Sequence, residues 1–297
     1  MPSQEFHDLV ARLRSLQRDG SPTVGEMRAG WDKFAAQFPA ADDLRFEAVD
    51  ADGVPAEWTD APGVDMSRVV FYLHGGGYNI GSIESYRHFV GRMSRAGKAR
   101  VLSVGYRLAP EHPFPAAVDD AVAAYRWLLG QGVPASRIVI SGDSAGGGLA
   151  LATMIRLRDE KGELPAAAVC MSPSTDLAKE GESMRTRAHL DPIVRIDTSS
   201  AHALRYVGEG GDFKHPLASP LYADLRGLPP LLILVGTNET LLDDSTRLAD
   251  KARAAGVEVE IEIWEDMVHI WPFFAAVLPE GQQAIERMGS YIRGRLP

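Results

Sequence analysis

The fold is decided by ten residues near the middle of the chain, Ile138-Val139-Ile140-Ser141-Gly142-Asp143-Ser144-Ala145-Gly146-Gly147. The apolar, β-branched beginning predicts a buried strand, and the segment rich in Gly, Ala and Leu that follows predicts a helix. The residues between them match G-x-S-x-G, the sharp strand-to-helix turn that holds a serine in a strained backbone conformation. Small neighbours leave room for the Ser144 hydroxyl to project above the sheet. This context favours a nucleophilic serine over an ordinary tight turn.

From about residue 43 onward, the chain alternates short apolar runs with helical segments. Such alternation predicts a mostly parallel sheet with helices on both faces. The predicted strands cover 44–49, 55–59, 68–73, 100–104, 137–141, 166–171, 230–235 and 257–264, and the clearest helices cover 116–129, 148–158 and 244–255.

Two segments do not fit this alternation. Residues 1–42 predict two amphipathic helices on either side of the break Gly20-Ser21-Pro22. We interpret their apolar faces as packing on a core, with a mobile lid as the alternative. Residues 175–221 offer no good central strand but contain helical pieces such as 201–207. We therefore expect a cap, formed by residues 1–42 and about 176–218, on a catalytic domain spanning residues 43–297.

Composition limits the function classes. The 297 residues fit one large α/β domain, and the net charge of −9 argues against binding nucleic acid or anionic lipid. The single cysteine, Cys170, lies in an apolar run, is interpreted as buried, and cannot form an intramolecular disulfide, which suits a reducing compartment. Neither a signal-peptide pattern nor a run of about eighteen apolar residues is present. We expect a cytoplasmic protein with no membrane span.

A run of glycines follows the strand predicted over 68–73 and reads His74-Gly75-Gly76-Gly77-Tyr78. Glycines free the backbone to turn N–H groups toward a ligand, and the oxyanion that forms on an attacked carbonyl needs such donors. No Gly-Lys-Ser or Gly-Lys-Thr follows, and the G-x-G-x-x-G spacing is absent, so we exclude phosphate-loop and dinucleotide sites. His74 is interpreted as support for the backbone and not as a metal ligand. We expect an oxyanion hole in which Gly75 permits the turn and N–H groups come from the other members, the full set being Gly75, Gly76, Gly77 and Ala145.

A serine hydroxyl is a weak nucleophile and needs a base. After a turn of this kind the catalytic order along the chain is Ser, acid, His, with the His beyond the last strand. His269 stands just after the strand predicted over 257–264 and is the predicted base. We interpret the histidines that precede the expected acid as surface or cap residues, namely His7, His88, His112, His189, His202 and His215.

The acid should follow the strand predicted over 230–235, in a loop that contains Glu239, Asp243 and Asp244. Glu239 is the favoured candidate because it lies nearest the end of the strand. Asp243 or Asp244 precedes a predicted helix, so N-capping explains one of them without catalysis. Asp243 stays open as the alternative acid.

Together these motifs resemble those of the bacterial branch of the hormone-sensitive-lipase family of esterases. The resemblance covers nearly the whole chain and rests on His74-Gly75-Gly76-Gly77-Tyr78, Tyr106-Arg107-Leu108-Ala109-Pro110-Glu111, Gly142-Asp143-Ser144-Ala145-Gly146-Gly147, Gly227-Leu228-Pro229-Pro230 and Met267-Val268-His269. It implies an α/β-hydrolase fold, with a mostly parallel eight-stranded sheet, helices on both faces and a helical cap. It also implies a carboxylesterase for short acyl chains that needs no cofactor and forms homodimers, often through the last strand.

One motif departs from the family. Many members carry Asp-Pro-Leu-Arg-Asp after the penultimate strand, where this chain has Glu239-Thr240-Leu241-Leu242-Asp243. The resemblance places the catalytic acid at Glu239, a role that glutamate fills in Ser-His-Glu triads. The departure keeps Asp243 open as a candidate.

The sequence thus predicts a serine carboxylesterase that uses Ser144, His269 and Glu239 on a small-molecule ester. Lactone hydrolysis and acyl transfer to an alcohol stay open because they use the same triad. A non-catalytic binding protein is disfavoured because a serine, a histidine and an acid are all present. The shape of the pocket depends on how the cap packs, and packing inside the cap is the alternative role for most of the candidate lining residues, which are Trp31, Phe34, Tyr78, Leu204 and Tyr206.

Overall fold

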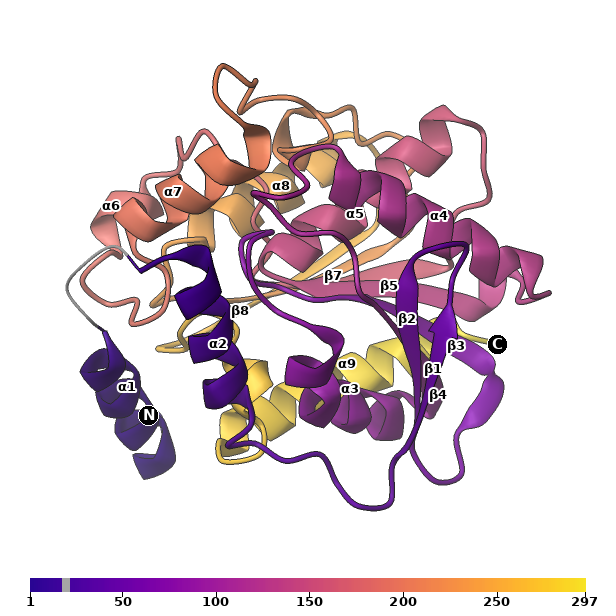
Figure 1. Cartoon of the computed structure of the whole chain (residues 1–297), viewed down its shortest axis with the longest axis horizontal. Coiled ribbons are helices and arrows are strands. Elements are labelled where there is room, and N and C mark those ends of the chain that lie inside the picture. Colours follow the sequence, from indigo (N-terminus) through magenta and orange to yellow (C-terminus); the bar gives the residue numbers. More distant parts are fainter. Residues whose placement is uncertain (18–21) are drawn as a thin grey trace.

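The computed structural model describes residues 1–17 and 22–297 and shows an eight-stranded sheet between two layers of helices (Figure 1). The strand order is β1-β2-β4-β3-β5-β6-β7-β8. Strand β2 is antiparallel to β1 and β4, and the other neighbours are parallel, which confirms the predicted sheet. The strands are β1 (Arg45–Asp50), β2 (Pro55–Asp60), β3 (Asp65–Leu73), β4 (Ala99–Val104), β5 (Ile138–Asp143), β6 (Ala167–Met171), β7 (Leu231–Gly236) and β8 (Val259–Trp264).

Strand β3 illustrates how the two helical layers arise. Val69, Phe71 and Leu73 belong to one hydrophobic core, and Val70 and Tyr72 belong to the other, because successive side chains of a strand point to opposite faces. Helices α4, α5 and α8 cover the first face, and α3 and α9 cover the second (Figure 1). The helices are α1 (Gln4–Leu16), α2 (Val24–Ala35), α3 (Ile83–Gly97), α4 (Ala116–Gly130), α5 (Ala145–Asp159), α6 (Ser183–Thr186), α7 (Ile196–Val207), α8 (Leu242–Ala254) and α9 (Pro279–Arg295).

All the predicted strands and helices occur, but helix α5 begins at Ala145, earlier than the predicted residue 148. The glycines at its start are there for close packing. A Cβ on Gly146 would lie 2.0 Å from the carbonyl oxygen of Leu73, so only glycine lets α5 start directly behind the turn. The sequence pattern did not specify α3 and α9, which fill the second layer.

The parallel strands end at one edge of the sheet, where ligands bind in open α/β sheets. The glycine run follows β3, Ser144 follows β5, Glu239 follows β7 and His269 follows β8. Residues that lie far apart in the sequence are therefore brought to the same edge.

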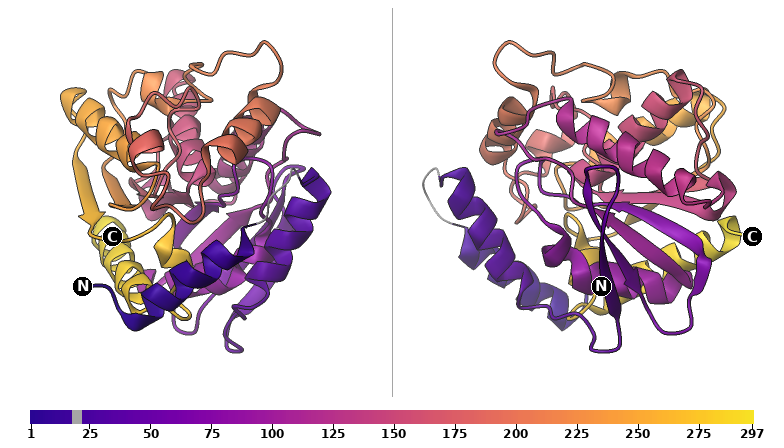
Figure 2. Two further views of the ribbon diagram at one scale, coloured as in Figure 1. Left: turned by 90° about the vertical axis from the view of Figure 1, so that its left-hand side faces the viewer. Right: turned by 45° about the vertical axis from the view of Figure 1, so that its right-hand side comes forward.

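The N-terminal residues form α1 and α2, and the insertion between β6 and β7 carries α6 and α7. Figure 2 shows the N-terminal helices in indigo against the body, and the insertion in orange above them. Both segments contact the loop after β3: Arg28 Nε of α2 donates to Asn79 O at 2.9 Å, and Asn79 Nδ2 donates to His202 O of α7 at 3.1 Å. In the predicted break Gly20-Ser21-Pro22, the first two residues lie outside the described residues.

Across residues 1–17 and 22–297, no helix is both long and apolar enough to cross a bilayer.

Candidate active site

Ser144 occupies the turn between β5 and α5. Its φ of 50° and ψ of −120° place a non-glycine residue in a region that L-amino acids rarely adopt. Backbone hydrogen bonds to β6 and the loop after it hold the turn: Ser144 N donates to Met171 O at 2.9 Å, and Ser144 O accepts from Ser174 N at 2.9 Å. The serine is partly exposed, so its hydroxyl is open to a substrate.

His269 lies in the loop after β8 and bridges Ser144 to Glu239. His269 Nε2 is 2.9 Å from Ser144 Oγ, and His269 Nδ1 is 2.8 Å from Glu239 Oε2. A carboxylate can only accept, so Nδ1 carries the proton and Nε2 is free to accept from the serine hydroxyl. The imidazole itself is buried.

Glu239 is fully buried in the loop between β7 and α8. Its second oxygen, Oε1, accepts from Ser172 Oγ at 2.9 Å and from Gly236 N at 2.5 Å. Ser172 Oγ in turn accepts from Ile270 N at 3.2 Å, so one hydroxyl ties the loop of the acid to the loop of the histidine. Ser172 was not singled out in the sequence, because it follows β6 and carries no motif.

Asp243, the alternative acid, lies elsewhere. Its carboxylate accepts from Ser183 N of α6 at 2.9 Å. Neither Asp243 nor Asp244 is the N-cap that the sequence predicted, because α8 begins at Leu242 and both residues fall in its first turn. Asp244 Oδ2 accepts from Thr175 N at 2.7 Å and from Asp176 N at 2.9 Å. The geometry brings Glu239 alone of the three candidates to His269.

Burial and charge act in opposite directions on this pair. Burial by itself lowers the pKa of His269, but the hydrogen bond and negative charge of Glu239 outweigh burial, so the pKa of His269 is raised. Burial raises the pKa of Glu239, although the bonds from His269 and Gly236 act against this. The arrangement stabilises an imidazolium next to Ser144.

Two residues of the glycine run have backbone conformations that favour glycine. Gly76 and Gly77 have φ values of 113° and 61°, which glycine adopts without steric cost. Within the described parts of the chain, the N–H groups of Gly76, Gly77 and Ala145 have no hydrogen-bond acceptor. Gly75 differs from them, because its N–H donates to Asp143 Oδ1 at 2.8 Å and is not free to face an oxyanion. Gly75, which the predicted set included for the turn, anchors the loop through Asp143 and does not donate to the site.

Asp143 holds this loop from below. Its fully buried carboxylate accepts from Tyr72 OH at 2.6 Å and Tyr86 OH at 2.8 Å, in addition to Gly75 N. A Cβ on Gly75 would lie 2.3 Å from Asp143 Oδ2, so the loop sits directly on the carboxylate. The His74 imidazole contacts the same backbone, with Nδ1 2.7 Å from Gly75 O, and the His74 carbonyl oxygen accepts from Tyr106 OH at 2.6 Å.

Comparison with known proteins agrees with this architecture. Residues 70–273 match the family described as the alpha/beta hydrolase fold. An acetyl-hydrolase of Streptomyces hygroscopicus is 50% identical over 238 residues, which cover 80% of this chain and 79% of that protein. A solved esterase from the bacterial hormone-sensitive lipase (HSL) family aligns over 100% of both chains, with 46% identity and a TM-score of 0.97. The chain belongs to the bacterial hormone-sensitive lipase family of α/β-hydrolases.

The relatives include EstE5, whose crystals were soaked with p-nitrophenyl butyrate; it is 48% identical, covers 99% of both chains and has a TM-score of 0.95. The prediction of a hydrolase of the lipase and esterase type is confirmed by these names.

The five residues expected to line the pocket of the esterase occupy three different environments. Trp31 and Phe34 pack in an aromatic cluster with Phe273 and Phe274 and fix α2 to the body. Leu204 is 47% exposed, on the side of α7 opposite to His202. Tyr78 and Tyr206 are fully buried and stacked on each other, with ring centroids 3.7 Å apart.

Of the histidines predicted to be surface or cap residues, His88 is buried in the body, whereas His202 lies on α7 in the insertion. His88 is buried on α3 against Phe38 and Phe273. His202 packs against Gly77. Amphipathic spacing could not reveal either contact, because it says that a face is buried and not what covers it.

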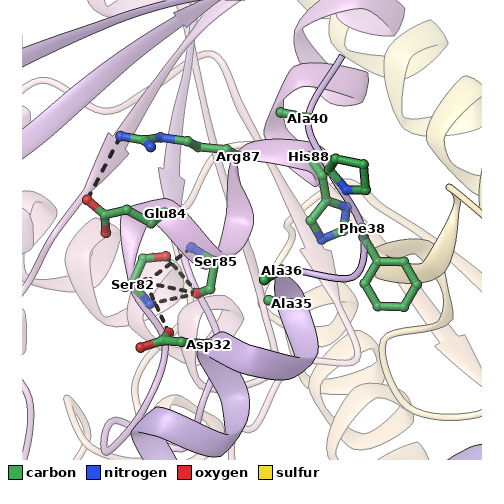
Figure 3. A pocket seen from close by; sticks show the side chains of 11 residues that line it. Asp32, Ala35, Ala36, Phe38, Ala40, Ser82, Glu84, Ser85, Arg87 and His88 are labelled. Atoms are coloured by element: carbon green, nitrogen blue, oxygen red, sulfur yellow. Dashed lines mark hydrogen bonds and ion pairs between the residues drawn. The ribbon is translucent and has the colours of Figure 1, made fainter. Parts of the chain in front are cut away.

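An open groove of about 520 Å³ lies between α2 and α3, and none of Ser144, Glu239 and His269 lines it (Figure 3). Hydrogen bonds join Asp32, Ser82 and Ser85 at one end, and His88 and Phe38 lie at the other. Ser144 and His269 do not contribute to it. The groove is lined by Asp32, Ala35, Ala36, Phe38, Pro39, Ala40, Ser82, Glu84, Ser85, Arg87 and His88.

Proposed function

We propose that this esterase is a serine carboxylesterase that hydrolyses short-chain esters through an acyl-enzyme intermediate. The observation that carries the proposal is the continuous hydrogen-bonded chain from Ser144 Oγ through His269 to Glu239, next to N–H groups that have no other acceptor in the described structure. A nucleophile, a base, an orienting acid and oxyanion donors are the parts that acyl transfer requires.

In the first step, Ser144 Oγ attacks the ester carbonyl carbon while His269 Nε2 takes the hydroxyl proton. Glu239 holds the Nδ1 proton and stabilises the imidazolium. The N–H groups of Gly76, Gly77 and Ala145 would bind the oxyanion of the tetrahedral intermediate. Removing one such donor typically costs about 10²–10³-fold in kcat. Collapse of the intermediate breaks the bond to the alcohol, which leaves with the proton from His269.

In the second step, His269 takes a proton from water, and the hydroxide attacks the acyl carbon. The second tetrahedral intermediate then collapses. The bond to Ser144 Oγ breaks, His269 gives its proton to this oxygen, and the acid is released. Each proton accepted by the imidazole is given back within the same half-reaction, so the cycle needs no cofactor.

The proposed substrate class, small esters with short acyl chains, is supported by the relatives. One relative is named an acetyl-hydrolase, and the crystals of another were soaked with p-nitrophenyl butyrate. We take p-nitrophenyl butyrate as the assay substrate.

Replacing Ser144 by Ala tests the proposal. We expect kcat on p-nitrophenyl butyrate to fall by on the order of 10⁴-fold or more, because the nucleophile is lost. Thermal unfolding of the variant should match that of the wild type. Turnover near the wild-type level would refute the assignment.

We further propose that the enzyme acts in the cytoplasm as a homodimer joined along β8. This strand is last in the sheet order, and Ile263 on it is 49% exposed. Light scattering during size-exclusion chromatography should give twice the mass of one chain, and Ile263→Lys should shift it to the monomer. A monomer at every concentration would contradict the pairing.

A further inference from the structure

Five buried polar atoms without a hydrogen-bond partner in the described structure gather where α7 meets the loop after β3. We call this contact the α7 seam, and its atoms are Tyr78 OH, Asn79 Oδ1, His202 Nε2, Arg205 Nη1 and Tyr206 OH. Folded proteins satisfy most buried polar atoms, and those left over need an explanation such as a bound water or ligand. These five side chains come from only two segments, so unused hydrogen-bonding capacity is concentrated at one contact.

The α7 seam adjoins the reacting centre of the proposed esterase. A Cβ on Gly77 would lie 2.3 Å from His202 Nδ1, so the imidazole lies directly against one of the proposed oxyanion-hole glycines. Asn79 Nδ2 fixes this contact by donating to Gly77 O at 2.6 Å and to His202 O at 3.1 Å. The seam therefore borders the place where the ester carbonyl would bind.

Basic side chains lie at and near the α7 seam. His202 and Arg205 lie three residues apart on α7, and Lys179 Nζ donates to Ser199 Oγ, three residues before His202. Arg205 forms no ion pair with any described residue. Two carboxylates also act on Lys179: Asp176, which pairs with Arg247 at 2.8 Å, and Asp244, whose Oδ2 accepts two backbone N–H groups.

His202 is suited to respond to an anion. Burial, with the positive charges of Arg205 and Lys179, lowers the pKa of His202 to about 4. The imidazole is therefore neutral at neutral pH and has one N–H to donate. A bound carboxylate would compensate the same positive charges that now disfavour protonation.

We propose that the α7 seam is a subsite for a carboxylate carried by the substrate, with Arg205 and His202 as the donors. The preferred substrates are then monoesters of short dicarboxylic acids, in which the free carboxylate is held while Ser144 attacks the ester. This inference rests on the proposed esterase function and adds a substrate class to it.

Two substrates of similar length distinguish the carboxylate subsite from esterase activity alone. One is p-nitrophenyl butyrate, which is neutral, and the other is mono-p-nitrophenyl succinate, which carries a carboxylate. We expect Arg205→Gln to lower kcat/KM on the succinate ester by about tenfold or more, as loss of a charge-assisted hydrogen bond does, mainly through KM. The same variant should change kcat/KM on the butyrate ester by less than about twofold, because that ester has no group for the subsite. His202→Gln should act in the same direction.

The matched control is Arg226→Gln, since Arg226 is an exposed arginine paired with Asp224. It removes the same charge and should leave the ratio of the two kcat/KM values unchanged. Equal effects of Arg205→Gln on both esters, or the same change of ratio in Arg226→Gln, would overturn the subsite and leave only water in the seam. Failure of the esterase proposal would appear separately, as a wild-type enzyme that does not hydrolyse p-nitrophenyl butyrate.

Discussion

The loop after β3 has two sides that differ in one respect. Beneath it, the Asp143 carboxylate accepts three hydrogen bonds, and at the neighbouring triad Glu239 does the same. Above it, the α7 seam leaves five polar atoms without a partner in the described part of the chain. The side with Asp143 and Glu239, which we call the saturated side, has the character of a scaffold, because each of the two carboxylates already accepts three hydrogen bonds. The unsatisfied side has the character of a binding surface.

The largest expected effect comes from the saturated side. Glu239→Gln should lower kcat on p-nitrophenyl butyrate by on the order of 10³–10⁴-fold, because an amide no longer fixes the tautomer of His269. The base works when neutral, and Glu239 raises the pKa of His269, so the acid limb of kcat/KM should move to lower pH in the variant. A full pH–rate profile measures both effects.

The control for that variant is Asp243→Asn, which removes a carboxylate in the first turn of α8 that accepts from Ser183 N and is not bonded to His269. It should keep most of the turnover and the wild-type acid limb. The reverse outcome, loss of turnover in Asp243→Asn alone, would return the acid to Asp243.

Asp143→Ala comes next. It removes the acceptor for Gly75 N–H and for two tyrosine hydroxyls, which frees the loop to shift. We expect kcat to fall by roughly 10²-fold, the scale of losing an oxyanion donor, with little change in KM. Asp143→Asn keeps one acceptor oxygen and should lose less, which separates loop position from failure to fold. An Asp143→Ala enzyme that folds and turns over like the wild type would show that the loop needs no anchor.

The smallest effects come from a pair of tyrosine hydroxyls. Tyr86→Phe removes a donor to Asp143 and should lower the free energy of unfolding by about 1–3 kcal/mol. Tyr206→Phe removes a buried hydroxyl with no partner among the described residues and should change it by less than about 0.5 kcal/mol. Urea denaturation measures both values. Equal losses would mean that the Tyr206 hydroxyl has a partner and that the contrast between the two sides is false.

The sequence predicted those parts of the molecule that depend on local pattern and chain order. The central strands were placed because buried parallel strands are continuously apolar, as in β5 and β7. Ser144 and His269 were singled out by a motif and by their position after particular strands. In the described structure the two side chains are hydrogen-bonded to each other.

The remaining features depend on contacts between distant elements. Glu239 and Asp243 are only four residues apart, one before α8 and one in its first turn, and only the fold directs one of them to His269. The anchor of the glycine loop needs Tyr72 from β3 and Tyr86 from α3, neither of which carries a signature. The roles of the candidate lining residues stayed open for the same reason, since the apolar spacing of α2 and α7 does not say which surface each face meets.

The most direct test of the account is covalent labelling with a fluorophosphonate, followed by mass spectrometry of the digested protein. Such a probe reacts with a serine that an adjacent base has activated. If Ser144 is the nucleophile activated by His269, one peptide is modified, with the label on Ser144, and the Ser144→Ala and His269→Ala variants take no label. A label on another residue, or a wild-type enzyme that hydrolyses p-nitrophenyl butyrate without taking the label, would contradict it.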